Sequence, residues 1–147
     1  MAAEKDLSAR GFAIVIVGVG ALLCCGTPTA GFYHYRKDAR DEPGIRAAGD
    51  AYLSAVARRD FAAAYDLLCA ADRRRQSRDD WLAWAPSDPA PTGYRITDVR
   101  IERPGGTTPT LRSVTAEVTF AQWGSRTVHL NIERQDGHWK VCSPDVF

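Results

Sequence analysis

A run of 19 residues without a charged side chain, Phe12 to Ala30, constrains this chain more than any other feature. As a helix, the run would extend about 28 Å at about 1.5 Å per residue, close to the hydrocarbon thickness of a bilayer. It contains glycines and a proline but no polar face, whereas a helix in a globular core usually shows an amphipathic stripe. We therefore expect a transmembrane helix over residues 12–33, preceded by an N-terminal tail over residues 1–11.

The flanks of this run disfavour its removal from the chain. A cleaved signal peptide needs small residues at the cleavage site, where Pro28 stands, and a lipoprotein needs a small residue before the modified cysteine, where Leu23 precedes Cys24. Aromatic rings and cations then follow, as at the end of many membrane-spanning helices. These predicted membrane-interface residues are Tyr33, Tyr35, Arg36 and Lys37. The expected partner is the lipid bilayer, and residues 34–42 are expected to form a juxtamembrane linker.

The first part of the remaining chain has the apolar spacing of helices. A first helix is predicted from Pro43 to Arg58, with apolar residues every three or four positions. Asp60 is a predicted N-cap for a second helix over residues 61–75. A third, short helix follows Ser77 and carries Trp81 on its apolar face.

The second part changes to the alternation of apolar and polar residues that is typical of strands. Four antiparallel strands are predicted, over residues 94–103, 113–121, 126–135 and 137–143. Asp136 and Gly137 should form the tip of the last hairpin. Because Ile96 and Val99 have opposite parity, a β-bulge is expected near Thr97 and Asp98. The predicted fold class is therefore α+β, with helices packed on a curved four-stranded sheet.

The order of these elements resembles that of a known superfamily. The segments that carry the likeness are "ARRD", "FAAAYDLLCAADRR", "SRDDWLAW", "YRITDVRI", "VTAEVTF" and "GHWKVCSP". They resemble the nuclear transport factor 2-like superfamily, in particular small membrane-anchored members of unknown function from high-GC Gram-positive bacteria. The resemblance implies a cone-shaped domain over residues 43–147, with a sheet that wraps a long helix and a pocket at the open end.

Two cysteines of this domain bear on its compartment. Cys69 lies on the apolar stripe of the second predicted helix and Cys142 in the last strand, so both could face one seam as a disulfide or as two buried thiols. A disulfide needs an oxidising compartment. The cations Arg36, Lys37, Arg40 and Arg46 favour a cytoplasmic domain instead, but long domains translocate largely regardless of flanking charge. We therefore expect an extracytoplasmic domain.

Catalytic groups are sparse. Enzymes of the superfamily that the chain resembles pair a base with a proton donor, and the candidates here are Asp98, Tyr52 and Tyr65. Without zinc-ligand spacing, a phosphate loop or a nucleophile motif, we expect no metal and no cofactor. A formal net charge of +1 disfavours nucleic acid as a partner.

The expected role is a membrane-anchored binding or adaptor module without catalysis. Its partner would be another membrane or envelope protein, or a small apolar ligand. Two alternatives stay open: a small pocket enzyme of the isomerase or hydrolase type, and an accessory subunit of a membrane transport assembly.

Overall fold

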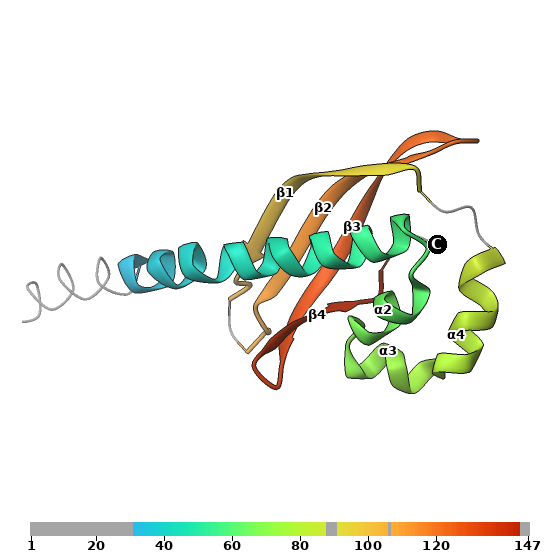
Figure 1. The fold of residues 1–147 in the computed structure, drawn as a ribbon. Coiled ribbons are helices and arrows are strands. Elements are labelled where there is room, and N and C mark those ends of the chain that lie inside the picture. The colour runs from blue at the N-terminus through green and yellow to red at the C-terminus, as the bar shows by residue number, and fades with distance from the viewer. Residues whose placement is uncertain (1–30, 88–90, 106, 145–147) are drawn as a thin grey trace, which may run out of the picture. The chain divides into compact units, whose positions relative to one another are not determined.

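The computed structural model describes residues 31–87, 91–105 and 107–144. The chain divides into two compact units, Met1–Ala39 and Arg40–Phe147. Of the first unit, residues 31–39 are described, and they are helical. The second unit holds a helical layer and a four-stranded sheet (Figure 1). The α+β class predicted from the sequence is confirmed for this unit.

The prediction of a transmembrane helix is wrong for the described part of the chain. No helix there is long and apolar enough to cross a membrane. Residues 12–30 of the predicted span lie outside the described residues. Residues 31–33 belong to a helical run that continues through the charged residues between Arg36 and Glu42, so the described part of this run is not apolar.

That run, the long helix, covers residues 31–57 and therefore begins before the predicted start at Pro43. It also includes residues 34–42, where the sequence predicts a linker. Pro43 has no N–H to donate to the carbonyl of Ala39, four residues earlier. The division between the two units falls directly after Ala39. Beyond Pro43 the helix buries one stripe of side chains: Ile45, Ala48, Tyr52, Leu53 and Val56.

The sheet contains β1 (Gly93–Glu102), β2 (Leu111–Phe120), β3 (Gly124–Gln135) and β4 (His138–Cys142). Its order is β1-β2-β3-β4 and every neighbouring pair is antiparallel, as predicted. The register shifts between Ile96 and Asp98, which confirms the predicted bulge. Asp136 and Gly137 have φ angles of 50° and 82°, as a tight hairpin with the favoured twist requires.

One face of the sheet is buried against the helices. The inward side chains of β2 and β3 alternate along the strands: Val114, Ala116, Val118, Phe120, Val128, Leu130 and Ile132. The long helix crosses this face (Figure 1). It approaches closely at Gly49, where an added Cβ would lie 3.0 Å from a methyl group of Val114. A glycine suits this crossing because a Cβ at position 49 would press on the Val114 side chain, which would have to shift by a few tenths of an ångström.

Three short helices follow the long one: α2 (Phe61–Asp66), α3 (Ala70–Arg75) and α4 (Arg78–Trp84), with a 3-10 turn η1 (Ala85–Ser87) after them. Asp60 caps α2 by accepting a hydrogen bond from the Ala63 N–H at 3.1 Å. Ser77 caps α4 in the same way through the Asp80 N–H. The predicted cap at Asp60 is confirmed, and the third helix begins after Ser77 as expected.

The second predicted helix is broken in the middle, so its prediction as one element over residues 61–75 is wrong. Leu68 instead forms a parallel bridge with Val141 of β4. The Cys69 N–H donates to the Val141 carbonyl at 2.8 Å, and the Val141 N–H donates to the Leu67 carbonyl at 3.0 Å. Pairing with β4 therefore replaces the helical hydrogen bonds at this point.

Candidate functional site

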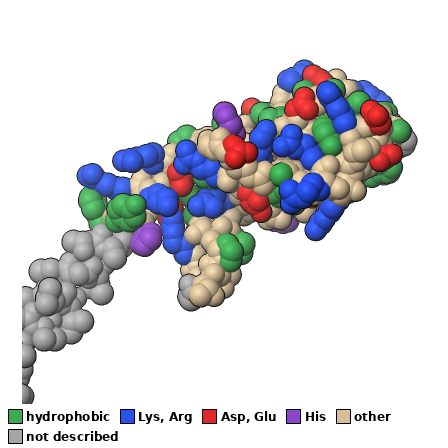
Figure 2. All heavy atoms as spheres, turned by 90° about the horizontal axis from the view of Figure 1, so that it is seen from below, with side chains coloured by type: hydrophobic (Ala, Val, Ile, Leu, Met, Phe, Trp, Pro, Cys, Tyr) green, Lys and Arg blue, Asp and Glu red, His purple; other side chains and the backbone are tan. Residues whose placement is uncertain are grey.

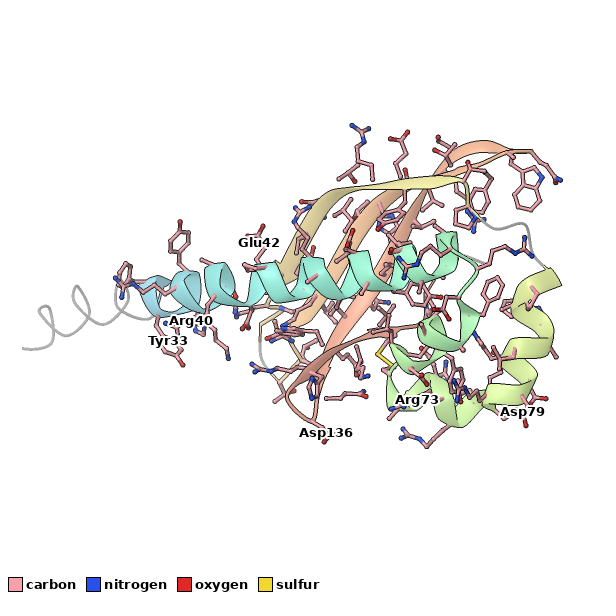
Figure 3. The ribbon with its side chains drawn as sticks, viewed as in Figure 1. Tyr33, Arg40, Glu42, Arg73, Asp79 and Asp136 are labelled. Atoms are coloured by element: carbon pink, nitrogen blue, oxygen red, sulfur yellow. A yellow bond between two sulfur atoms is a disulfide. The ribbon has the colours of Figure 1, made fainter. Side chains whose placement is uncertain are left out.

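Cys69 and Cys142 form a disulfide across the seam between this break and β4, visible as the yellow bond in Figure 3. Their Cα atoms lie 5.2 Å apart, within the usual range for a disulfide. Both residues are buried. The Asp72 carboxylate supports the seam by accepting a hydrogen bond from the Ser143 N–H.

The carboxylate of Glu133 also lies near the two sulfurs, with all three potential ligand atoms within 4.8 Å of one another. A cysteine binds a metal ion as a thiolate. Because both sulfurs are joined in the disulfide, neither can act as a thiolate ligand here. Cys69 and Cys142 therefore form a structural disulfide, and the exposed Glu133 carboxylate lies beside it.

The three candidate catalytic residues are not brought together. Asp98 is exposed at the bulge, and its carboxylate forms an ion pair with Arg100 at 3.5 Å. Tyr52 is fully buried, and its hydroxyl has no hydrogen-bond partner within the described residues. Burial, and then the nearby charge of Asp72, raise the pKa of Tyr52 far above its ordinary value. The Tyr65 hydroxyl donates to the carbonyl of Gln76 at 3.0 Å.

These positions have consequences for chemistry. A general base has to reach the proton that it removes, at a heavy-atom distance of about 3 Å. Asp98 faces solvent, Tyr52 is closed off from it, and the Tyr65 hydroxyl is engaged by the backbone. None of the three lines any of the three cavities of the described chain that are set out below.

The predicted interface residues lie on the long helix. Tyr33 and Tyr35 are 65% and 71% exposed. Tyr33 projects from the helix in Figure 3. The Arg36 guanidinium lies 4.5 Å from the centre of the Phe32 ring, in a cation–π contact. This part of the helix thus presents aromatic rings and cations to its surroundings.

A first cavity, the helix–strand groove, lies between the long helix and β1. It has a volume of about 590 Å³ and is lined by Pro43, Arg46, Ala47, Asp50, Tyr94, Arg95 and Ile96. The Tyr94 hydroxyl donates to the Asp50 carboxylate at 2.9 Å. Partial burial, and then this hydrogen bond, raise the pKa of Tyr94. Arg95 is held by Glu117 at 2.7 Å, so much of the polar lining is already paired.

Sequence reasoning missed this Tyr94–Asp50 pair. The helical period places Asp50 on the same face of the helix as Pro43 and Ala47, and this is the only local sequence pattern that concerns Asp50 here. Its partner Tyr94 lies 44 residues further along the chain. No spacing rule joins a helix residue to a strand residue at that separation.

A second cavity, the aromatic cleft, lies beside α3 and α4. It has a volume of about 410 Å³ and is lined by Leu68, Asp72, Arg75, Gln76, Trp81, Trp84, Ser143 and Pro144. The Trp81 and Trp84 rings lie 5.9 Å apart, and the Trp81 indole N–H donates to the Phe61 carbonyl at 3.0 Å. Trp84 is 43% exposed. This wall of rings suits contact with apolar or aromatic groups.

A third cavity, the arginine pocket, lies at the sheet near the disulfide. It has a volume of about 610 Å³ and is lined by Pro109, Thr110, Leu111, Arg112, Asn131, Ile132, Glu133, Arg134, Cys142 and Ser143. Two guanidinium groups therefore border one cavity with several hydroxyl and amide groups. An arrangement of this kind can bind an anion.

No family model matches this chain, and no curated protein matches it either. The resemblance to the nuclear transport factor 2-like superfamily therefore stays a prediction. The function of this chain has to be inferred from its own residues and contacts.

Proposed function

We propose that residues 40–147 form a binding or adaptor domain that works outside the cytoplasm and catalyses no reaction. The observation that carries the proposal is the disulfide between Cys69 and Cys142. Structural disulfides persist in oxidising compartments and are rare where thiols are kept reduced. In this domain the bond joins the break after α2 to the last strand, and so it links the helical layer to the sheet.

Two further observations support binding rather than catalysis. The candidate catalytic groups Asp98, Tyr52 and Tyr65 lie apart from one another. Large apolar side chains are exposed instead, including Trp84 at 43% and Trp123 at 62%. Exposed aromatic side chains are common anchors in protein interfaces and ligand clefts. The proposed partner is therefore an envelope protein or a small apolar ligand.

The experiment is accessibility labelling of a cysteine introduced at Ser125, an exposed position at the start of β3. Intact cells that express Ser125→Cys would be treated with a membrane-impermeant maleimide. An extracytoplasmic domain reacts in intact cells, whereas a cytoplasmic one reacts only after the cells are opened. The unsubstituted chain is the matched control, because its domain cysteines are joined to each other.

Mass spectrometry of the unreduced protein gives a second readout. The proposal requires a peptide pair linked through Cys69 and Cys142 in material taken from cells under thiol-blocking conditions. Free thiols at both positions, together with labelling only in opened cells, would overturn the proposal.

A further inference from the structure

The arginine pocket contains two cations that share one aromatic ring. The guanidinium carbons of Arg112, on β2, and Arg134, on β3, each lie 5.4 Å from the centre of the Trp139 ring. Arg134 faces Trp139 directly across the β3–β4 pair. The indole is itself held at the long helix, because a Cβ added at Gly44 would lie 2.7 Å from its Cδ1 atom. A fixed ring thus positions both cations.

Neither cation is neutralised by a carboxylate within the described residues. The ion pairs found there involve Arg75, Arg78, Arg95 and Arg100. The acid nearest in sequence to Arg134 is Glu133, whose carboxylate accepts a hydrogen bond from the Gln135 amide at 3.1 Å. Two like charges against one ring repel each other, and an anion between them would remove that repulsion.

One N–H donor of the two arginines has no hydrogen-bond acceptor among the described residues. The Nε atom of Arg112 is buried, and it has no hydrogen-bond partner in the described part of the chain. Another nitrogen of the same group, Nη1, donates to the Thr110 carbonyl at 3.3 Å. A buried donor without an acceptor is unfavourable, especially on a charged group. The Arg112 guanidinium is therefore only partly satisfied by the described residues.

Three residues of the remaining lining can donate to an anion with several oxygens, beside the Glu133 carboxylate. Thr110, Asn131 and Ser143 border the same cavity and carry hydroxyl or amide donors. Figure 2 shows Lys and Arg side chains spread over the face of the molecule drawn there, with acidic side chains among them.

From this geometry we propose that the arginine pocket binds a phosphate group, either inorganic phosphate or a small phosphate monoester, between Arg112 and Arg134. A tetrahedral phosphate offers enough oxygens to accept from the guanidinium groups of Arg134 and Arg112 at once. A lone carboxylate has two oxygens and would satisfy the two arginines less completely. This inference rests on the pocket alone, and it holds whichever compartment the domain occupies.

The test is a titration of the full chain with inorganic phosphate, at constant ionic strength, followed through the arginine Nε–H signals in ¹H–¹⁵N NMR spectra. We expect the Arg112 Nε–H signal to shift and saturate at millimolar phosphate or below. Arg134→Gln should weaken binding at least about tenfold. Arg134 is exposed, so this variant should keep the unfolding midpoint of the parent.

Arg100→Gln is the matched control, because Arg100 is an exposed arginine already paired with Asp98 and Glu102. Phosphate affinity should be unchanged in this variant. A signal that never saturates, equal shifts at Arg100 and Arg112, or equal affinity for acetate would each overturn the inference. Phenyl phosphate in a parallel titration distinguishes a monoester from the free ion. Cell labelling at Ser125 tests location and not this pocket, so the two proposals can fail separately.

Discussion

Removing the disulfide is the perturbation whose size can be worked out most directly. The bond joins residues 73 apart in the sequence. The loop-entropy relation for a loop of that length gives about 4 kcal/mol of stabilisation at 25 °C, through restriction of the unfolded chain. The Cα separation is ordinary, and two backbone hydrogen bonds hold the same seam independently.

The assay compares urea unfolding of the oxidised chain, the reduced chain and the Cys69→Ala/Cys142→Ala variant, followed by tryptophan fluorescence. A domain of this size has a denaturant slope of about 1.5 kcal/mol per molar urea, so reduction should lower the midpoint by roughly 2 to 3 M. The double variant should be slightly less stable than the reduced chain, because it also loses the packing of two sulfurs.

The reduced chain separates the cross-link from the side chains, because both sulfurs stay in place. A difference below about 1 kcal/mol between the oxidised and reduced chains would refute the argument from loop entropy. In that case the backbone pairing of Leu67 and Cys69 with Val141 would account for the stability of the seam without help from the bond.

Three further outcomes concern single positions. Gly44→Ala places a methyl group against the indole of Trp139, so it should lower the free energy of unfolding by about 1 to 3 kcal/mol. Gly31→Ala is the control and should not lower it, because no atom lies within 4 Å of the added methyl group. Thermal unfolding of the two variants measures the difference. Tyr52→Phe removes a buried hydroxyl without a partner, so at pH 7 it should leave stability unchanged or raise it by up to about 1 kcal/mol. Because the folded pKa of Tyr52 is raised, the unfolded state loses its proton first, so stability should fall above about pH 10, and less steeply in Tyr52→Phe; urea unfolding at several pH values measures this. Gly137→Ala puts a side chain at a φ of 82° and should cost about 1 to 2 kcal/mol, measured by the same unfolding assay.

The sheet could be predicted from the sequence because its signals are local. Alternation along β2 and β3 identified the buried face, and the opposite parity of Ile96 and Val99 located the bulge to within a residue. Asp136 and Gly137 identified the last hairpin from two adjacent letters. Each of these signals depends on neighbours a few positions apart, so a single sequence is enough to read them.

The features that failed depend on distant partners. Residues 61–75 have the apolar spacing of one helix, but Val141 takes the backbone groups at Leu67 and Cys69 into a strand pairing. The length of the long helix escaped prediction for a different reason. Pro43 is typical of a helix start. Its ring also fits inside a helix when the Ala39 carbonyl does without the hydrogen bond that an N–H at residue 43 would donate.

The cavities could not be predicted either, because the residues that line each of them lie far apart in the sequence. The sequence could bring Cys69 and Cys142 to one seam, although it left a disulfide and two buried thiols open. The arginine pocket draws its residues from three strands, and the ring between its two cations is held at Gly44 of the long helix. Nothing in the spacing of Arg112, Arg134 and Trp139 indicates that they meet.

The bulge at Thr97 also bears on how copies of this protein behave in crowded solution. At one side of the sheet, residues 67–69 cover β4, while β1 at the other side has no further strand beside it in the described chain. An uncovered strand of ten residues is a template for edge-to-edge aggregation, and a bulge interrupts that template. Deleting Thr97 would restore strict alternation from Tyr94 to Ile101 without moving an apolar residue to the wrong face. We therefore expect a chain without Thr97 to keep its buried face and to associate more readily through the exposed edge of the sheet.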